Sequence, residues 1–205
     1  RFGPVILGVR EKVIYGSGYI EDVLCGKRFR ISSRSFYQIN PVQTEKLYSA
    51  AIGLAGLTGN ETVLDAYCGI GTIGLSASDK AKQVIGVEIN RDAVNDAIAN
   101  ARLNGVKNCW FTVGDAGKYM EQMAADKVKP DIVFMDPPRA GSDERFLSSL
   151  LKCAPKRIVY ISCNIDTQRR DLDVLLSGGY KLRRIQPVDM FPYTEHIECV
   201  VMLEK

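Results

Sequence analysis

Short apolar runs alternate with amphipathic stretches from residue 62 to the end of the chain. The runs are rich in Val, Ile and other strand-forming residues, and most end near Gly, Asn, Asp or Pro. Such runs predict buried strands, because a strand covered on both faces does not need polar positions in alternation. We predict strands at residues 62–66, 83–88, 109–113, 131–135, 157–162, 182–189 and 197–203.

Helical patterns occupy most of the intervals between these runs. Residues 91–103 repeat Ala93, Ala97 and Ala101 at four-residue spacing, and residues 166–176 open with an acidic residue. A chain that alternates strands and helices predicts an α/β fold with a doubly wound, mostly parallel, seven-stranded Rossmann-like sheet. Only a loop separates the last two strands, so we expect these two to pair antiparallel.

The first part of the chain has a different pattern. Residues 41–54 predict a helix with a proline at its start. Before it, apolar runs at 5–9, 19–24 and 29–31 are broken by glycines, which is typical of short antiparallel strands.

The composition is typical of one globular domain with a small appendage. The chain has 205 residues, of which 46% are hydrophobic, enough to bury a sizeable core. We expect a small β-rich lobe at 1–40 and the main domain at 41–205. Because the chain opens with Arg1, we also expect a domain upstream to be missing. No long uncharged apolar run and no signal-peptide pattern occur, so we expect a cytoplasmic monomer without a membrane partner.

Metal chemistry is disfavoured by the residues available for it. The six cysteines are scattered without C-x-x-C pairs, and His196 is the only histidine. Zinc and iron–sulfur sites usually need such pairs or a histidine cluster. We therefore expect reduced thiols and no metal site. The formal net charge of +3 is compatible with a polyanionic partner but does not identify one.

A glycine-rich loop follows the first predicted strand of the main domain. It contains the pattern G-x-G-x-x-G at Gly69, Gly71 and Gly74, and Glu88 ends the next strand. Glycines let a backbone approach a ligand closely, and a carboxylate at that strand end can accept hydrogen bonds from ribose hydroxyls. Nicotinamide dinucleotides and S-adenosylmethionine both use these features, so the loop alone leaves the two open.

Two observations favour S-adenosylmethionine. A helix and a lobe precede the glycine loop, whereas a dinucleotide-binding fold normally starts at its glycine-rich strand. Asp65 stands before the loop, where a carboxylate suits a cationic ligand and would repel a pyrophosphate. The alternative for Asp65 is an ordinary cap at the end of a strand.

The fourth strand ends in Asp136-Pro-Pro-Arg139. An acidic residue followed by two prolines forms a rigid end to a strand, above the ligand crevice of such a sheet. The related motif of enzymes that methylate exocyclic amines has an aromatic residue where this chain has Arg139. A ring carbon lacks a lone pair, so a carbon methyltransferase needs a nucleophile that activates its substrate.

Cys163 and Glu198 are the candidate nucleophile and base. Cys163 follows the fifth strand and precedes a helix, whose amino-terminal end is expected to lower the thiol pKa from about 8.5 toward neutrality. Glu198 shares a strand face with Val200 and Met202, so we expect it to be buried, with a raised pKa. Taken alone, each residue is better explained by a structural role, as an apolar filler or as a carboxylate at a sheet end; the combination with Asp136-Pro-Pro-Arg139 favours the catalytic role.

Taken together, the motifs resemble those of the RNA 5-methyluridine methyltransferases, which act on transfer and ribosomal RNA. The resemblance spans nearly the whole chain. It is carried by Ser35-Phe-Tyr-Gln-Ile-Asn-Pro41, Asp65-Ala-Tyr-Cys-Gly-Ile-Gly71, Val87-Glu88, Asp136-Pro-Pro-Arg139, Ser162-Cys-Asn164 and His196-Ile-Glu198.

The resemblance implies a role for each candidate residue. Cys163 would attack carbon 6 of the uracil, and Glu198 would remove the proton on carbon 5. Arg139 and His196 would hold the base or shape its pocket. The residues implied to bind S-adenosylmethionine are Gln38, Asp65, Tyr67, Gly69, Gly71, Thr72, Glu88 and Asp136. Some relatives have asparagine where this chain has Thr72.

RNA is therefore the expected partner. We expect 23S ribosomal RNA in particular, because the residues of several motifs are most like those of bacterial ribosomal-RNA enzymes. Relatives also carry an amino-terminal RNA-binding β-barrel, and some an iron–sulfur cluster; this sequence shows neither. The alternatives are a tRNA uridine-5-methyltransferase, an RNA cytosine-5-methyltransferase, an amino-group methyltransferase, an NAD-dependent enzyme and a non-catalytic RNA-binding module.

Overall fold

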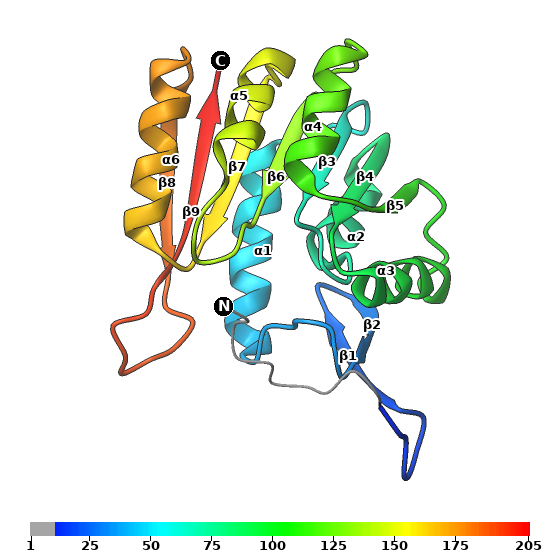
Figure 1. Cartoon of the computed structure of the whole chain (residues 1–205). Coiled ribbons are helices and arrows are strands. Elements are labelled where there is room, and N and C mark those ends of the chain that lie inside the picture. The colour runs from blue at the N-terminus through cyan, green and yellow to red at the C-terminus, as the bar shows by residue number, and fades with distance from the viewer. Residues whose placement is uncertain (1–10) are drawn as a thin grey trace.

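The computed structural model describes residues 11–205 of the chain (Figure 1). Two short strands come first, and a regular alternation of helices and strands follows, as the sequence predicts. The strands are β1 (Tyr19–Leu24), β2 (Lys27–Ser32), β3 (Thr62–Ala66), β4 (Gln83–Glu88), β5 (Cys109–Val113), β6 (Ile132–Met135), β7 (Arg157–Ser162), β8 (Lys181–Val188) and β9 (Glu198–Glu204). The helices are α1 (Pro41–Ala55), α2 (Thr72–Ala77), the 3-10 turn η1 (Ser78–Lys80), α3 (Arg91–Leu103), α4 (Ala116–Ala125), α5 (Glu144–Cys153) and α6 (Ile165–Ser177).

The main sheet has seven strands in the order β5-β4-β3-β6-β7-β9-β8. The strands from β5 to β7 are parallel, whereas β9 runs antiparallel to both β7 and β8. The predicted doubly wound sheet with an antiparallel ending is therefore confirmed. Predicted and observed strand ends differ by one residue in β6, β8 and β9, and β2 is longer than predicted.

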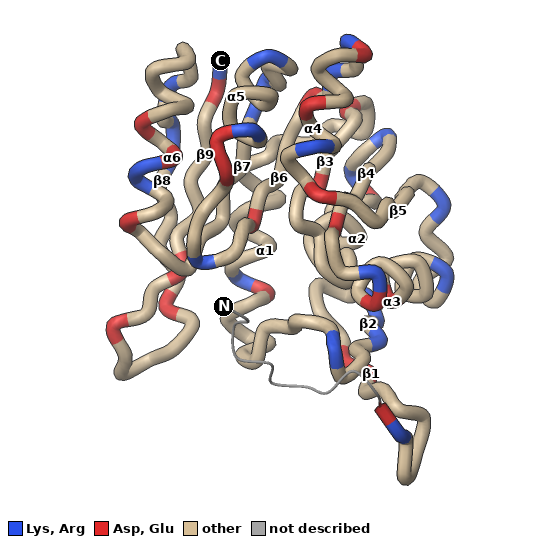
Figure 2. The backbone as a smooth tube through the Cα atoms, in the orientation of Figure 1, with Lys and Arg blue, Asp and Glu red and all other residues tan. Residues whose placement is uncertain are grey.

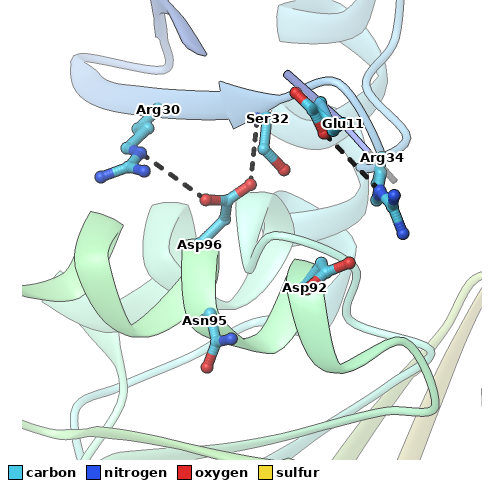
Figure 3. A pocket seen from close by; sticks show the side chains of 7 residues that line it. All are labelled: Glu11, Arg30, Ser32, Arg34, Asp92, Asn95 and Asp96. Atoms are coloured by element: carbon cyan, nitrogen blue, oxygen red, sulfur yellow. Dashed lines mark hydrogen bonds and ion pairs between the residues drawn. The ribbon is translucent and has the colours of Figure 1, made fainter. Parts of the chain in front are cut away.

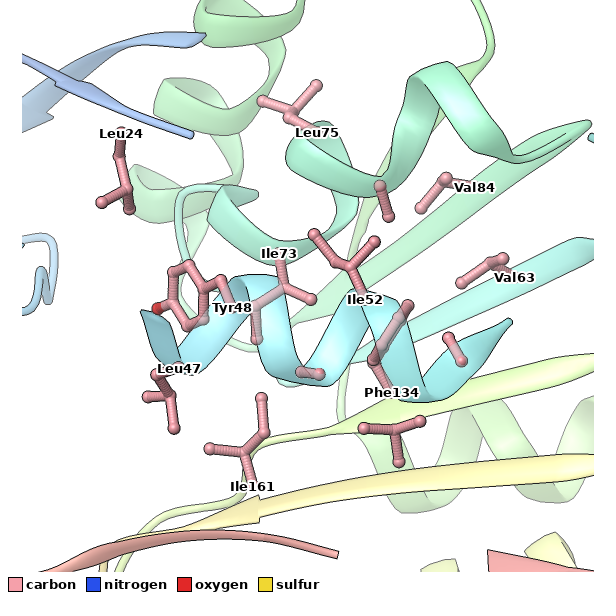
Figure 4. Packing of buried hydrophobic residues seen from close by; sticks show 14 of the residues in the cluster. Leu24, Leu47, Tyr48, Ile52, Val63, Ile73, Leu75, Val84, Phe134 and Ile161 are labelled. Carbon is pink, nitrogen blue, oxygen red and sulfur yellow. The ribbon is translucent and has the colours of Figure 1, made fainter. Parts of the chain in front are cut away.

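Helices cover both faces of this sheet, and a buried cluster lies under each set (Figure 1). One cluster joins α1, α2 and the β1–β2 hairpin to residues such as Phe134 and Ile161 (Figure 4). The other joins α4, α5 and α6 to Val133, Met135 and Tyr160. Successive residues of β6 and β7 thus enter opposite clusters, which explains why these strands are apolar throughout. In the described part of the chain, no helix has the length and apolarity to cross a membrane.

The β1–β2 hairpin is attached to α3 by two asparagines one helical turn apart. Asn100 accepts from the N–H of Arg30 at 2.7 Å and donates to its carbonyl at 3.2 Å. Asn104 makes the same pair of bonds with Arg28, at 2.8 and 2.6 Å. The side chains of α3 thus act as a neighbouring strand for β2. The predicted strand at 5–9 lies outside the described residues.

A small polar pocket of about 450 Å³ lies in this seam between β2 and α3 (Figure 3). Its central carboxylate, Asp96, accepts from the Ser32 N–H at 3.0 Å and the Ser35 hydroxyl at 2.9 Å, and lies 3.7 Å from Arg30. These contacts attach the hairpin to the helix. In the described part of the chain, Lys and Arg residues are spread over helices, loops and strand ends (Figure 2).

Candidate active site

A cavity of about 860 Å³ opens at the carboxyl ends of the parallel strands, where ligands bind in sheets of this type. Several segments far apart in the sequence meet there: the residues before α1, the ends of β3, β4, β6 and β7, and the loop between β8 and β9. The candidate residues that line it are Gln38, Tyr67, Gly69, Glu88, Asp136, Arg139, Cys163, His196 and Glu198.

Glu88 is held in place by backbone groups at one side of the cavity. Its two carboxylate oxygens accept from the N–H of Gly69 at 3.1 Å and of Asn90 at 2.8 Å. The glycine loop and the end of β4 are thereby joined. Each carboxylate oxygen can accept more than one hydrogen bond, so Glu88 can still accept from a ligand in the cavity.

Gly71 and Thr72 shape the loop from behind and do not line the cavity. Gly71 has a φ of 82°, and a Cβ there would lie 2.9 Å from the Phe111 ring, so only glycine fits. The Thr72 hydroxyl donates to the Tyr48 hydroxyl at 3.3 Å inside the core. Gly71 and Thr72 thus pack against the protein, and their predicted contacts with a ligand stay predictions.

Asp65 also lies beneath the loop, not in the cavity wall. It is 1% exposed, and its Oδ2 accepts from the Gly74 N–H at 2.9 Å. Its Oδ1 is buried without a hydrogen-bond partner among the described residues. Burial, and less strongly the charge of Glu88, raise its pKa to about 7, although the Gly74 N–H opposes the shift. Asp65 thus supports the loop from below, and its predicted direct contact with a ligand stays a prediction.

Tyr67 lines the cavity with a strained backbone. Its φ of 63° lies in the left-handed region, which is uncommon for a residue with a side chain. The hydroxyl donates to Ser142 Oγ at 3.2 Å, and the ring lies 5.4 Å from that of Phe146. These contacts hold the side chain against the loop that follows the Asp136-Pro-Pro-Arg139 motif.

The pairing of β7 with β9 brings the candidate nucleophile and base together. Ser162, the last residue of β7, lies opposite Cys199 in the antiparallel register. Cys163 therefore leaves the sheet beside Glu198, the first residue of β9, and both line the same cavity. Two residues 35 positions apart in sequence thus meet at one ligand site.

The electrostatics of this end of the cavity confirm one pKa prediction and correct the other. Burial raises the pKa of Glu198, which is 4% exposed, and Arg139 opposes the shift. The pKa of the Cys163 thiol is also raised, by burial and then by the charges of Glu198 and Asp136, with Arg139 again opposing. The prediction of a lowered thiol pKa is wrong, because burial and the two carboxylates outweigh the groups that lower it. The side chain of Asn164 meanwhile accepts from the first N–H groups of α6.

Asp136 belongs to the same electrostatic group. Its pKa is raised well above its usual range, by burial first and then by the charges of Glu198 and Asp65. A proton is therefore held more tightly by Asp136 and Glu198 than by ordinary carboxyls. The arrangement can offer a sulfur nucleophile and proton acceptors to one small ring.

Sequence reasoning missed several lining residues, among them Phe36, Asp115 and Phe191. Asp115 follows β5 directly and caps α4 through the Lys118 N–H at 2.9 Å. The strand-end rule that selects Glu88 and Asp136 would have found it. Phe191 lies in the β8–β9 loop, for which the sequence offers no comparable signal. Among residues 11–205, no His, Cys, Asp and Glu side chains gather into a possible metal-binding group.

Comparison with known proteins gives the family. The model of the tRNA (uracil-5-)-methyltransferase family matches residues 7–205, almost the whole chain. The chain belongs to this family. The family's relatives include an uncharacterized RNA methyltransferase of Halalkalibacterium halodurans, 54% identical over 200 residues, and one of Listeria innocua, 52% identical over 199 residues. These alignments cover 98% and 97% of the chain but 44% of each relative, so the chain spans less than half of their length.

A solved structure with the same fold is the Pyrococcus abyssi tRNA (uracil-54, C5)-methyltransferase in complex with S-adenosyl-L-homocysteine. It is 33% identical, with a TM-score of 0.79, over 92% of this chain and 45% of that one. A putative SAM-dependent methyltransferase from Streptococcus mutans reaches a TM-score of 0.76 at 12% identity, over 93% of this chain and 56% of that one. At that identity the likeness concerns the fold alone.

Proposed function

We propose that this chain is the catalytic part of an enzyme that transfers a methyl group from S-adenosylmethionine to carbon 5 of a uridine in RNA. The single observation that supports this most strongly is the meeting of Cys163 and Glu198 at one cavity through the β7–β9 register. Family membership and the likeness to an enzyme crystallised with S-adenosyl-L-homocysteine support the methyl donor and the reaction class.

The charges around the cavity fit this donor better than a dinucleotide. Its acidic lining residues are Glu88, Asp115, Asp136 and Glu198, against the single arginine Arg139. A sulfonium and an amino group are attracted to such a lining, whereas a pyrophosphate is repelled. Glu88 would accept from the ribose hydroxyls, and Gln38 and Tyr67 would bind the remainder.

The chain's own residues account for the remaining chemistry. The Cys163 thiolate adds to carbon 6 of the uracil, which increases electron density at carbon 5. S-adenosylmethionine, when bound, would supply the electrophilic methyl group: its methyl–sulfur bond breaks as carbon 5 takes up the methyl, and S-adenosylhomocysteine remains. Glu198 then accepts the proton of carbon 5, and the carbon–sulfur bond breaks to release the Cys163 thiolate and the methylated ring. Its raised pKa suits Glu198 for this step.

Arg139 is proposed to hold the base during both steps. It lines the cavity and lowers the pKa of both Cys163 and Glu198, so its charge is close to the two reacting groups. A guanidinium can donate to a uracil carbonyl on which negative charge develops after sulfur addition. His196, which lies in the wall formed by the β8–β9 loop, is proposed to shape the base pocket.

RNA that contains 5-fluorouridine tests the reaction, because fluorine cannot leave as the proton does. We expect a covalent protein–RNA adduct that survives denaturation and needs S-adenosylmethionine. Cys163→Ala should abolish it, whereas Cys25→Ala, which changes a thiol outside the cavity, should not. An adduct that persists in Cys163→Ala would refute the assignment. With unmodified RNA, Glu198→Gln should accumulate the adduct, because the final proton removal is blocked.

Two RNA classes are candidates for the substrate. The residues of several motifs resemble those of bacterial ribosomal-RNA enzymes and favour 23S ribosomal RNA, whereas the family description and the Pyrococcus abyssi relative refer to tRNA. Mapping of 5-methyluridine on total RNA with and without the protein would decide between them. Appearance of 5-methylcytidine as the product would instead favour a cytosine-5-methyltransferase, although such enzymes place a cysteine near the Pro-Pro motif where this chain has Arg139.

A further inference from the structure

Asp171 is a fully buried carboxylate on α6, outside the cavity and without a role in the reaction described above. Its Oδ2 accepts from the Ser142 N–H and from the Tyr160 hydroxyl, both at 2.8 Å. Its Oδ1 accepts from the Arg170 guanidinium at 2.9 and 2.6 Å. One side chain therefore connects α6, the centre of β7 and the loop that follows the Pro-Pro motif.

This loop, residues 139–142, is held along its length by α6. The carbonyl of Arg139 accepts from Asn164 and Thr167, both at 3.1 Å. Arg170 donates to the carbonyls of Ala140 and Ser142 at 3.0 and 3.1 Å. These donors are the N-cap of α6 and two residues in the first half of this helix, which begins two residues after Cys163.

The turn at Gly141 shows how closely the loop and helix approach each other. Gly141 has a φ of 77°, and a Cβ there would lie 2.5 Å from an Arg170 nitrogen and 2.8 Å from Asp171 Oδ2. The loop could not lie so close to these two side chains with any other residue at this position. The Asp171 and Arg170 side chains thus face the turn at close range.

The loop ends at residues that touch both halves of the active site. At its start, Arg139 lines the cavity beside Cys163 and Glu198. At its end, the Ser142 hydroxyl accepts from Tyr67, which lines the same cavity. We propose that Asp171 is a positioning residue that fixes the 139–142 loop, and through it Arg139 on the base side and Tyr67 on the donor side.

The variant Asp171→Asn tests this role with little change of shape. The amide has a single oxygen, so it can accept from Ser142 and Tyr160 or from Arg170, but not from both sets. The other set then faces an NH₂ group, which is itself a donor. The matched control is Asp173→Asn, which removes an equal charge from an exposed position two residues along the same helix.

The role rests on the proposed function, so two measurements are needed. Misplacement of reacting groups lowers rates by up to about 100-fold, and we expect a fall of this order in the rate of 5-fluorouridine adduct formation at saturating RNA and S-adenosylmethionine. S-adenosylhomocysteine affinity, measured by calorimetry without RNA, should fall about tenfold, as for one lost buried hydrogen bond. Asp173→Asn should match the wild type in both.

A purely structural role would lower the unfolding midpoint of Asp171→Asn and leave both values unchanged in protein that is folded at the assay temperature. That result would overturn the proposal. If the wild type binds S-adenosylhomocysteine but forms no adduct, the proposed reaction fails, and the affinity of Asp171→Asn alone decides the role of Asp171. Should this variant not fold, Arg170→Met changes a partly exposed residue and removes the hydrogen bonds from Arg170 to the carbonyls of Ala140 and Ser142. It should show smaller falls in the adduct rate and in the S-adenosylhomocysteine affinity.

Discussion

The buried carboxyl of Asp65 makes the stability of the protein depend on pH. Its pKa is about 7 in the folded chain, against an ordinary value of 3.8. A carboxyl with a raised folded pKa favours folding while it is protonated, and this contribution is lost as pH rises from 3.8 to about 7. The variant Asp65→Asn lacks the titration, and its amide oxygen can still accept from the Gly74 N–H.

The size of the effect follows from the shift. Each pKa unit is worth about 1.4 kcal/mol, so about 4 kcal/mol is lost in total, and about 3 kcal/mol of this between about pH 5 and pH 8. For a domain of this length, 1 kcal/mol changes the unfolding midpoint by about 2–4 °C. We therefore expect the midpoint of Asp65→Asn, relative to the wild type, to rise by about 6–12 °C over that interval.

Thermal unfolding of both proteins, followed by circular dichroism at pH 5 and pH 8, measures how the difference between their midpoints changes with pH. At the lower pH the variant is expected to be no more stable than the wild type, because its NH₂ group replaces an oxygen that has no partner. Asp173→Asn, which changes an exposed carboxylate, should show no comparable change between the two pH values. A constant offset between Asp65→Asn and the wild type would refute the reasoning, because Asp65 would then have an ordinary pKa.

Two further outcomes follow from the cavity and the glycine loop. The rate of Cys163 alkylation by iodoacetamide, followed by mass spectrometry, should increase with pH. The pH at which this rate is half-maximal should be lower in Glu198→Gln than in the wild type, since the charge of Glu198 raises the thiol pKa. Equal half-maximal pH values would contradict this. Gly71→Ala should destabilise the fold by about 1–3 kcal/mol through its contact with Phe111 and its positive φ. Gly105→Ala, with a φ of 65° but open space around the added Cβ, should cost less, and equal losses in chemical denaturation would exclude the steric contribution.

The sheet was predictable because its strands are buried on both faces. The bounds of β3, β4, β5 and β7 agree with the prediction, since each is a short apolar run closed by a turn or a polar residue. The order of the strands and the antiparallel insertion of β9 between β7 and β8 depend on contacts far apart in sequence. A periodic pattern records which faces are buried, and it does not record which strand lies beside which.

The candidate site was predictable to the extent that its residues stand at strand ends. Glu88, Asp136 and Cys163 follow three neighbouring or near-neighbouring strands, so one rule places them at one edge of the sheet. Depth below the surface was not predictable. Asp65 is the penultimate residue of β3 and lies opposite Gly86, two residues before Glu88, which ends β4. Asp65 is therefore further from the edge of the sheet and lies under the loop, whereas Glu88 faces the cavity.

The prediction of a lowered pKa for the Cys163 thiol was wrong, and the reason is local. A helix amino terminus lowers a thiol pKa when its N–H groups point at the sulfur, but here Asn164 occupies the groups of Asp166 and Thr167. Burial raises the thiol pKa most, and the nearby carboxylates Glu198 and Asp136 raise it further, because a second negative charge is unfavourable beside them.

The same carboxylates link thiol ionisation to what the cavity contains. A positive charge placed among Asp136, Glu198 and Cys163 stabilises all three anions, and by reciprocity the ionised forms attract that charge. Arg139 already acts in this direction, because its charge lowers the pKa of the thiol and of Glu198. The guanidinium thus opposes the effect of burial and of the acidic lining on the thiol pKa. The acidic lining that weakens the isolated thiol is thus consistent with a donor that carries positive charge.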